Sequence, residues 1–112
     1  MSVLTIRASK RYATRLPVKL RRDGRKTAAS GLLIELSQQG ARISNLGRVK
    51  YDAGDSVVIV ALKDIQIEGT IRWAHDGLAG VRLDRSLHLP EMRELLELNR
   101  REQADDDRRY GT

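Results

Sequence analysis

The sequence predicts a small all-β domain followed by a C-terminal helix. Three observations indicate this class: short segments rich in β-branched residues, alternation of apolar and other residues along them, and turn signals between them. About six such strands in a chain of 112 residues are typical of a small antiparallel barrel or sandwich.

Three strands are expected in the first half of the chain. Residues 16–20 alternate apolar and other side chains, and Asp23-Gly24 then supplies the positive φ that a hairpin turn needs. A longer strand follows at about 26–36, and an extended pattern resumes at 41–44. These elements read as consecutive strands of one antiparallel sheet.

Side-chain alternation in the second strand divides its residues between two faces. Leu32, Ile34 and Leu36 are predicted to share the core face. Glu35 and Ser37 then project from the opposite face, where they are free for other contacts.

Three more strands are expected in the second half, joined by tight connections at Lys63-Asp64 and His75-Asp76-Gly77. The single tryptophan, Trp73, lies in a cleanly alternating segment, so we expect it in the core. The predicted strands are residues 56–62, 65–73 and 78–83.

A helix is predicted to close the domain. Pro90 suits a first helical position. Apolar residues at roughly helical spacing form a stripe that we expect to pack over one end of the barrel; they are Leu89, Met92, Leu95, Leu96 and Leu98. From about Gln103 the chain becomes charged, which predicts a disordered tail over 103–112.

Composition limits the chemistry that the chain can perform. The chain contains no cysteine, which excludes disulfides, thiolate metal sites and a cysteine nucleophile. It has no apolar run near the length of a membrane span, and its first residues lack the apolar stretch of a secretory signal. We therefore expect a cytoplasmic domain that is not inserted in a membrane.

Charge is distributed unevenly along the chain. The net charge is +6, but residues 1–26 hold nine basic residues and one acid, whereas the remaining residues hold 12 basic and 14 acidic. A positive field at one end attracts anions. The same pattern also fits a solubilising arm or one that touches nucleic acid or a membrane surface.

Two short motifs point to a ligand. The first is the Arg-x-x-x-Arg of Arg11 and Arg15. Residues four apart share a face of a regular helix or strand, so their guanidinium groups can converge on a phosphate or on a guanine edge. In a chain with 21 basic residues this motif is weak by itself.

The second motif, Glu-x-Ser-x-x-Gly at residues 35–40, narrows the class of ligand that the first motif allows. The Glu35 carboxylate can accept the two neighbouring donors of a guanine edge, and the Ser37 hydroxyl can donate to a phosphate oxygen. Gly40 permits a turn whose backbone amides approach a ligand. Together the motifs suit a ligand that is both anionic and purine-like.

In this order and at this separation, the motifs resemble those of the PilZ domain, the bacterial receptor module for the second messenger cyclic di-GMP. The family has Arg-x-x-x-Arg in an N-terminal segment, then Asp/Asn-x-Ser-x-x-Gly about twenty residues later. Glu35 stands where the family has Asp or Asn, and Leu83 replaces a common Phe. The similarity extends over roughly residues 8–100; it includes Gly31–Ile34, Gly40–Ile43, Gly69–Trp73 and Ala79–Leu83.

The resemblance implies a six-stranded barrel of the split-barrel type over residues 10–102, preceded by a flexible basic arm, 1–9. It also implies a sensor without catalysis and without a cofactor. Cyclic di-GMP would order the arm onto the barrel, and a downstream protein would respond, for example in motility or biofilm regulation. The implied ligand residues are Arg11, Arg15, Glu35, Ser37 and Gly40, with Lys10 and Arg42 as secondary phosphate contacts.

Other classes are less favoured by the sequence. The histidines, His75 and His88, lack the partners that a catalytic site needs. A barrel that binds DNA or RNA usually stacks bases on aromatic residues, which are scarce here, and Trp73 is expected in the core. The stronger alternative is an adaptor of the same fold with an eroded motif, which would act through protein contacts instead of the nucleotide.

Overall fold

The computed structural model describes residues 10–62 and 65–110, with side chains up to residue 101. Within them the chain forms six strands and one helix. The strands are β1 (Tyr12–Arg22), β2 (Ala28–Leu36), β3 (Gly40–Ser44), β4 (Ser56–Val60), β5 (Gln66–His75) and β6 (Leu78–Leu83), and the helix is α1 (Leu89–Tyr110).

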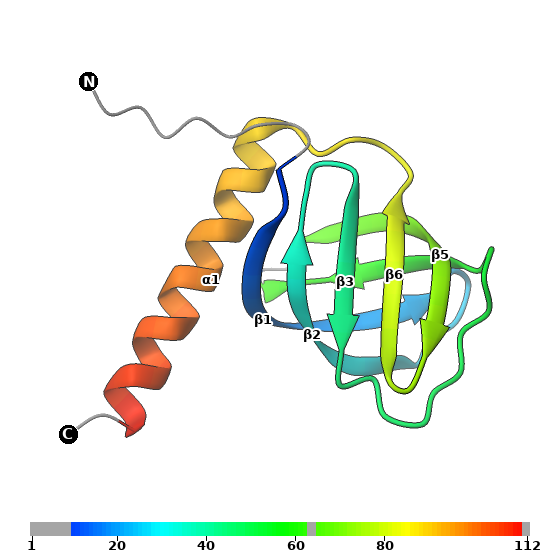
Figure 1. The fold of residues 1–112 in the computed structure, drawn as a ribbon, viewed down its shortest axis with the longest axis horizontal. Helices are drawn as coiled ribbons and strands as arrows, with labels where there is room; N and C mark the ends of the chain where they lie inside the picture. Colours follow the sequence, from blue (N-terminus) through cyan, green and yellow to red (C-terminus); the bar gives the residue numbers. More distant parts are fainter. Residues whose placement is uncertain (1–9, 63–64, 111–112) are drawn as a thin grey trace.

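The strands form a closed antiparallel barrel in the order β1-β2-β3-β6-β5-β4 (Figure 1). Pairing of β1 with β4, from Lys19 opposite Val60 to Arg22 opposite Val57, closes the sheet. The predicted fold class is thereby confirmed, including the six-stranded barrel that the family resemblance implies. The predicted turn at Asp23-Gly24 is also present, with a positive φ at the glycine.

Buried aliphatic side chains fill the barrel, and part of α1 covers it beside β1 (Figure 1). Met92, Leu95 and Leu98 of α1 are buried, as the apolar stripe predicts. Leu96 is only partly buried, and Leu89 is 44% exposed. The helix therefore packs through a narrower face than the sequence stripe indicates.

The helix is longer than expected. Its backbone remains helical up to Tyr110, whereas we expected the chain to leave the helix near Gln103. No Gly or Pro, the residues least favourable in a helix, interrupts 91–110. The predicted arm (1–9), the Lys63-Asp64 connection and residues 111–112 lie outside the described residues.

A β-bulge in β2 changes which side chains enter the core. Leu33 lies opposite Ile43 of β3, but the next pair is Glu35 opposite Arg42, so β2 has one extra residue. The buried residues are consequently Leu33 and Leu36. The predicted core face is therefore right for Leu36 but wrong for Leu32 and Ile34, because simple alternation does not continue through a bulge.

A second bulge, in β5, moves Trp73 out of the core. Ile71 pairs with Val81 and Trp73 with Gly80, which leaves Arg72 as the extra residue. Ile71 is buried and Ala74 packs against the core, so Trp73 lies on the outer face and is half-buried. The expectation that Trp73 is a core residue is wrong for this reason.

The N-terminus of α1 is capped by the side chain of Glu91. Glu91, in the first turn, accepts the backbone N–H of His88 at 3.0 Å. Its two carboxylate oxygens also accept Arg85 Nη1 at 2.8 Å and Nη2 at 2.7 Å. The hydrogen bonds from Arg85, and then that from His88, lower the pKa of Glu91 to about 2.

We expect Glu91→Gln to lower the melting temperature at pH 7 by roughly 1–6 °C, since partly exposed ion pairs contribute about 0.2–1 kcal/mol. Because the folded-state pKa of Glu91 is depressed, this contribution is present above the ordinary pKa of 4.5 and is lost as the pH falls toward about 2. Thermal unfolding of both proteins between pH 7 and pH 2 measures the difference. Glu94→Gln, with the same charge change on the same helix, is the control; an equal effect there would contradict the role of the cap.

Candidate functional site

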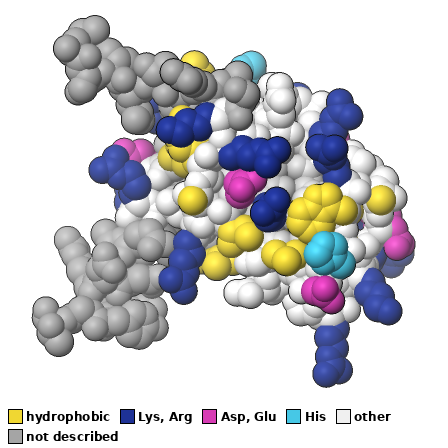
Figure 2. Space-filling model, in the orientation of Figure 1, with side chains coloured by type: hydrophobic (Ala, Val, Ile, Leu, Met, Phe, Trp, Pro, Cys, Tyr) yellow, Lys and Arg dark blue, Asp and Glu magenta, His cyan; other side chains and the backbone are white. Residues whose placement is uncertain are grey.

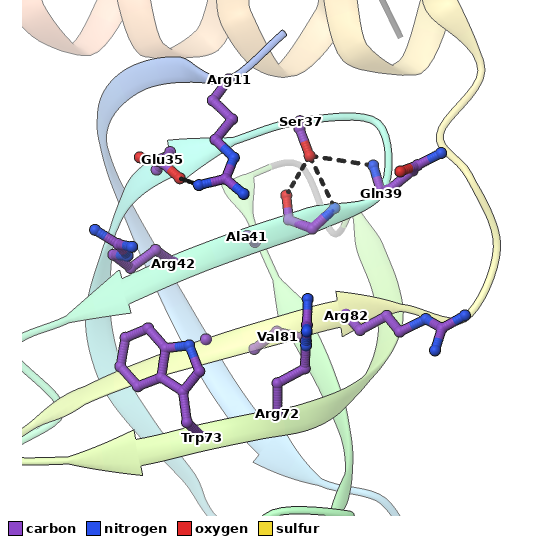
Figure 3. Close-up of a pocket in the computed structure, with 12 residues that line it drawn as sticks. Arg11, Glu35, Ser37, Gln39, Ala41, Arg42, Arg72, Trp73, Val81 and Arg82 are labelled. Atoms are coloured by element: carbon purple, nitrogen blue, oxygen red, sulfur yellow. Dashed lines mark hydrogen bonds and ion pairs between the residues drawn. The ribbon is translucent and has the colours of Figure 1, made fainter. Parts of the chain in front are cut away.

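A shallow pocket of about 340 Å³ lies on the outer face of the barrel (Figure 3). Its walls come from β2, β3, β5 and β6, from the turn between β2 and β3, and from the residue before β1. The lining residues are Arg11, Glu35, Ser37, Gln39, Gly40, Ala41, Arg42, Arg72, Trp73, Gly80, Val81 and Arg82.

One row of paired residues builds the central part of this pocket. Glu35 on β2 pairs with Arg42 on β3, Arg42 pairs with Gly80 on β6, and Gly80 pairs with Trp73 on β5. Directly paired residues point to the same side of a sheet. The barrel thus brings a carboxylate, a guanidinium group and an indole ring side by side, although the indole is far from the other two in the sequence.

Gly80 provides the space in which the indole lies. A Cβ atom at this position would come within 2.4 Å of Nε1 and Cε2 of Trp73, so the ring lies directly over the glycine backbone. Arg42 is placed over the indole at 5.6 Å from its centroid, and the His75 ring stacks with it at 5.1 Å. Trp73 is therefore held in a flat orientation against the barrel.

Ser37 shapes the turn between β2 and β3. Its hydroxyl oxygen accepts the backbone N–H of Gly40 at 3.0 Å and that of Gln39 at 3.3 Å. Its backbone N–H donates to the carbonyl of Gly40 at 2.9 Å. In this structure the Ser37 side chain therefore stabilises the backbone of the turn (Figure 3). Ser37, Gln39 and Gly40 of this turn line the pocket.

The same turn is fastened to the segment between β6 and α1. The Gln38 side chain donates to the carbonyl of Leu87 at 2.6 Å, and the Leu87 N–H donates back to the carbonyl of Gln38 at 2.8 Å. Leu83 N–H donates to the carbonyl of Gln39 at 2.9 Å. The turn is thus tied to the end of the barrel from which the helix begins.

Arg11 and Glu35, one residue from each motif, meet in the pocket. Arg11 Nη1 lies 3.7 Å from Glu35 Oε1, and the two side chains are 70% and 31% exposed (Figure 3). An ion pair this exposed is weak. Both groups can therefore exchange their mutual contact for a ligand at little cost.

Arg15 is placed differently from Arg11. A bulge in β1, between the pairs Ala13–Glu35 and Leu16–Leu33, interrupts the regular strand on which their convergence depended. The backbone N–H of Arg15 donates to Asn99 Oδ1 of α1 at 2.7 Å, and Arg15 does not line the pocket. The structure thus brings together five of the seven predicted residues, namely Arg11, Glu35, Ser37, Gly40 and Arg42.

Lys10, the other predicted residue outside the pocket lining, lies beside β1. Its ammonium group is placed over the ring of Tyr12, at 4.9 Å from the centroid. The hydroxyl of Tyr12 is buried without a hydrogen-bond partner among the described residues. A buried hydroxyl without a partner is unfavourable, so this end of β1 gains from any rearrangement that gives the hydroxyl a partner.

The pocket is strongly positive. Four arginines line it against the single acid Glu35; they are Arg11, Arg42, Arg72 and Arg82. Figure 2 shows Lys and Arg side chains around one acidic group on this face, with a hydrophobic patch and a histidine beside them. Such a surface is suited to an anionic ligand that also carries an aromatic ring.

Sequence reasoning missed part of this site. Trp73, Gly80, Arg72 and Arg82 line the pocket, yet the family resemblance marked their strands only as part of the fold and not as ligand contacts. Alternation alone placed Trp73 inside, and nothing in the sequence marks the Arg72 bulge. One sequence feature could have indicated that Trp73 lies on the outer face: Gly80, on the neighbouring predicted strand, leaves room for a large ring beside it.

Two kinds of site are absent from the part of the chain that the structure describes. No three His, Cys, Asp or Glu residues there could together hold a metal ion. Over the same residues, no helix is both long enough and apolar enough to span a membrane.

Residues 5–101 match the family model of the PilZ domain. The chain belongs to the PilZ domain family. The crystal structure of the PilZ domain of CeSA from a cellulose synthesizing bacterium is similar in fold, with a TM-score of 0.60 and 19% sequence identity. The likeness covers 81% of this chain and 95% of the CeSA domain. A search of curated proteins finds no match.

PilZ domains are a receptor family for cyclic di-GMP, and they are binding and regulatory modules rather than enzymes. Membership therefore supports a ligand-binding role for the pocket and gives no reason to search it for a nucleophile and base. The family does not by itself identify which residues of this chain hold a ligand.

Proposed function

We propose that this PilZ domain binds cyclic di-GMP in the pocket on the outer face of the barrel. The observation that carries the proposal is the meeting of the two sequence motifs in one positive pocket, where Arg11 of the first lies beside Glu35, Ser37 and Gly40 of the second. The ligand carries two phosphates and two guanines, and this pocket offers groups for both.

Each part of the ligand has a matching group. Arg11 and Arg42 donate to phosphate oxygens, with charge-assisted hydrogen bonds. The Glu35 carboxylate accepts the N1–H and N2–H₂ edge of one guanine. Trp73 provides a flat ring on which a guanine stacks. This stacking contact is not among the contacts predicted from the sequence.

Arg15 joins the site in the bound state under this proposal. Its backbone contact with Asn99 ties it to α1, so closing Arg15 and Lys10 on the ligand shifts the start of β1 relative to the helix. The N-terminal arm, 1–9, is drawn against the barrel in the same step. A downstream protein in the cytoplasm reads this change.

Titration calorimetry with cyclic di-GMP tests the proposal, with GMP and cyclic AMP as controls. We expect saturable binding to cyclic di-GMP alone, and the stoichiometry distinguishes one molecule from a stacked pair. No heat and no thermal shift up to high ligand concentration would contradict the proposal.

Glu35→Asp tests the departure from the family motif. We expect tighter binding of cyclic di-GMP, because the shorter side chain restores the family's acceptor position, and a charge-assisted hydrogen bond of about 2.7–2.9 Å depends on that position. The gain expected from improving one such contact is roughly tenfold or less. Calorimetry on both proteins measures it, with Glu35→Gln as the control that removes the charge; unchanged affinity in both would make Glu35 a bystander.

A second candidate function is a protein adaptor that does not bind the nucleotide. The observation that favours it is the contact between Arg11 and Glu35 themselves, while Arg15 lies outside the pocket lining. In that case Arg11 and Glu35 would stay paired with each other and would not bind a ligand. Failure of the calorimetric test, followed by capture of one specific partner, would support the adaptor.

A further inference from the structure

The outward position of Trp73 changes what this face of the barrel can bind. The sequence disfavours a nucleic-acid ligand on two grounds: aromatic residues are scarce, and the single tryptophan is expected in the core. In the structure, Trp73 lies on the outer face and lines a pocket with four arginines. The second ground is therefore removed, because Trp73 is available as a stacking surface.

We propose that this face binds single-stranded nucleic acid, with one base stacked on Trp73 and the phosphates on the surrounding arginines. Barrels that bind single strands combine a positive groove along the backbone with an aromatic ring on which bases stack. Both parts are present here, since Arg42 is placed over the indole and Arg72 and Arg82 line the same pocket.

The arrangement of charges fits a strand that crosses the barrel strands. Arg42 lies on β3, Arg82 on β6 and Arg72 on β5, and these three strands are neighbours in the barrel. Adjacent strands are about 4.8 Å apart, so the face from β2 to β5 spans roughly 14 Å. At about 3.4 Å per nucleotide of a stacked strand, this length corresponds to about four nucleotides.

Glu35 gives the face a preference among bases. It is the single acid among the lining residues, and its side chain is 31% exposed. A carboxylate accepts the neighbouring N1–H and N2–H₂ donors of guanine, which the other bases do not present together. We therefore expect strands that contain guanine to bind more tightly than strands of thymine or uracil alone.

The inference does not rest on the binding of cyclic di-GMP, but it uses the same face. A strand with a base on Trp73 and phosphates on Arg42 occupies the place assigned to the cyclic dinucleotide. The two ligands must therefore exclude each other, which gives the messenger a direct way to release a bound strand.

Fluorescence anisotropy with fluorescein-labelled octanucleotides tests the inference, using a guanine-containing DNA, its RNA counterpart and oligothymidine. We expect saturable binding whose logarithm falls with the logarithm of salt concentration at a slope of about −2 to −3, for three to four phosphate contacts. Between 50 and 200 mM salt, four contacts correspond to a loss of roughly 50-fold. No binding at 50 mM salt would overturn the inference.

Variants separate a defined face from general attraction to a basic protein. Trp73→Ala should weaken binding roughly 5- to 150-fold, and Trp73→Phe, which keeps a ring, should restore part of it. Arg42→Ala should reduce the salt slope by about 0.7. Arg25→Ala makes the same charge change in the turn between β1 and β2, outside the pocket lining, and should have little effect on strand binding. Equal losses from all these changes would overturn the inference.

Competition with unlabelled cyclic di-GMP distinguishes this inference from the proposed function. Displacement of the labelled strand supports both. Strand binding by a protein that does not bind cyclic di-GMP supports the inference and contradicts the proposed function. Binding of cyclic di-GMP without any strand binding, or binding of both at once, overturns the inference alone.

Discussion

Arg11→Ala is expected to weaken the binding of cyclic di-GMP about ten- to hundredfold while the melting temperature stays nearly unchanged. Loss of one charge-assisted hydrogen bond costs about 1.5–3 kcal/mol of binding free energy. The side chain is 70% exposed, and its ion pair with Glu35 is long at 3.7 Å, so folding depends little on it. Calorimetry and thermal unfolding on the same preparations measure the two effects.

Arg15→Ala provides the comparison within the same motif. A similar loss of affinity would show that both guanidinium groups close on the ligand, as we propose. If only Arg11→Ala weakens binding, the Arg15 guanidinium group does not contact the ligand; the hydrogen bond to Asn99 comes from the Arg15 backbone and is kept in the variant. Arg25→Ala, with the same change in net charge on an exposed residue of the β1–β2 turn, is the matched control. Binding that survives the loss of both Arg11 and Arg15 would exclude this pocket.

The predicted fold depended on local signals that the tertiary structure preserves. Asp23-Gly24 and Asp76-Gly77 have the backbone angles that their turns require, and the apolar segments between the turns all became strands. Local patterns left barrel and sandwich open, because closure depends on β1 pairing with β4, and no local pattern records a pairing between distant strands. The barrel was indicated by the resemblance to the PilZ family.

The predicted side-chain directions failed where a strand contains an extra residue. Alternation has a period of two, so one bulge exchanges the two faces for the rest of the strand. In β2 this brought Leu33 into the core, and in β5 it left Arg72 outward and turned Trp73 out with it. The bulge in β1 likewise interrupts the regular strand on which the convergence of Arg11 and Arg15 depended.

The part of the candidate site that belongs to the two motifs was predicted from the sequence, and the rest was not. Arg11, Glu35 and Gly40 do line one pocket, as the two motifs suggested. Ser37 illustrates the limit, because its hydroxyl holds the backbone of its own turn, a role that the residue type alone does not separate from a ligand contact. Trp73 escaped prediction because its place over Gly80 depends on the register between β5 and β6.

Gly80→Ala is expected to weaken cyclic di-GMP binding roughly 5- to 150-fold through Trp73 alone. The new Cβ would lie 2.4 Å from the indole, closer than side chains approach one another, so the ring must leave its place over the strand. The loss of one base stacked on an aromatic ring costs about 1–3 kcal/mol. Stability should change little, since alanine is slightly better than glycine in a strand and offsets part of the packing lost by a half-buried ring.

A double-mutant cycle decides whether the effect runs through the ring. In a Trp73→Ala background the clash is gone, so adding Gly80→Ala should cost nothing further in binding free energy. Because Trp73 is the only tryptophan, its fluorescence also reports the displacement directly: a red shift in Gly80→Ala without ligand indicates a ring moved into water. If Gly80→Ala weakens binding equally in both backgrounds, the backbone of Gly80 itself meets the ligand, and Trp73 is a neighbour of the site and not its stacking surface.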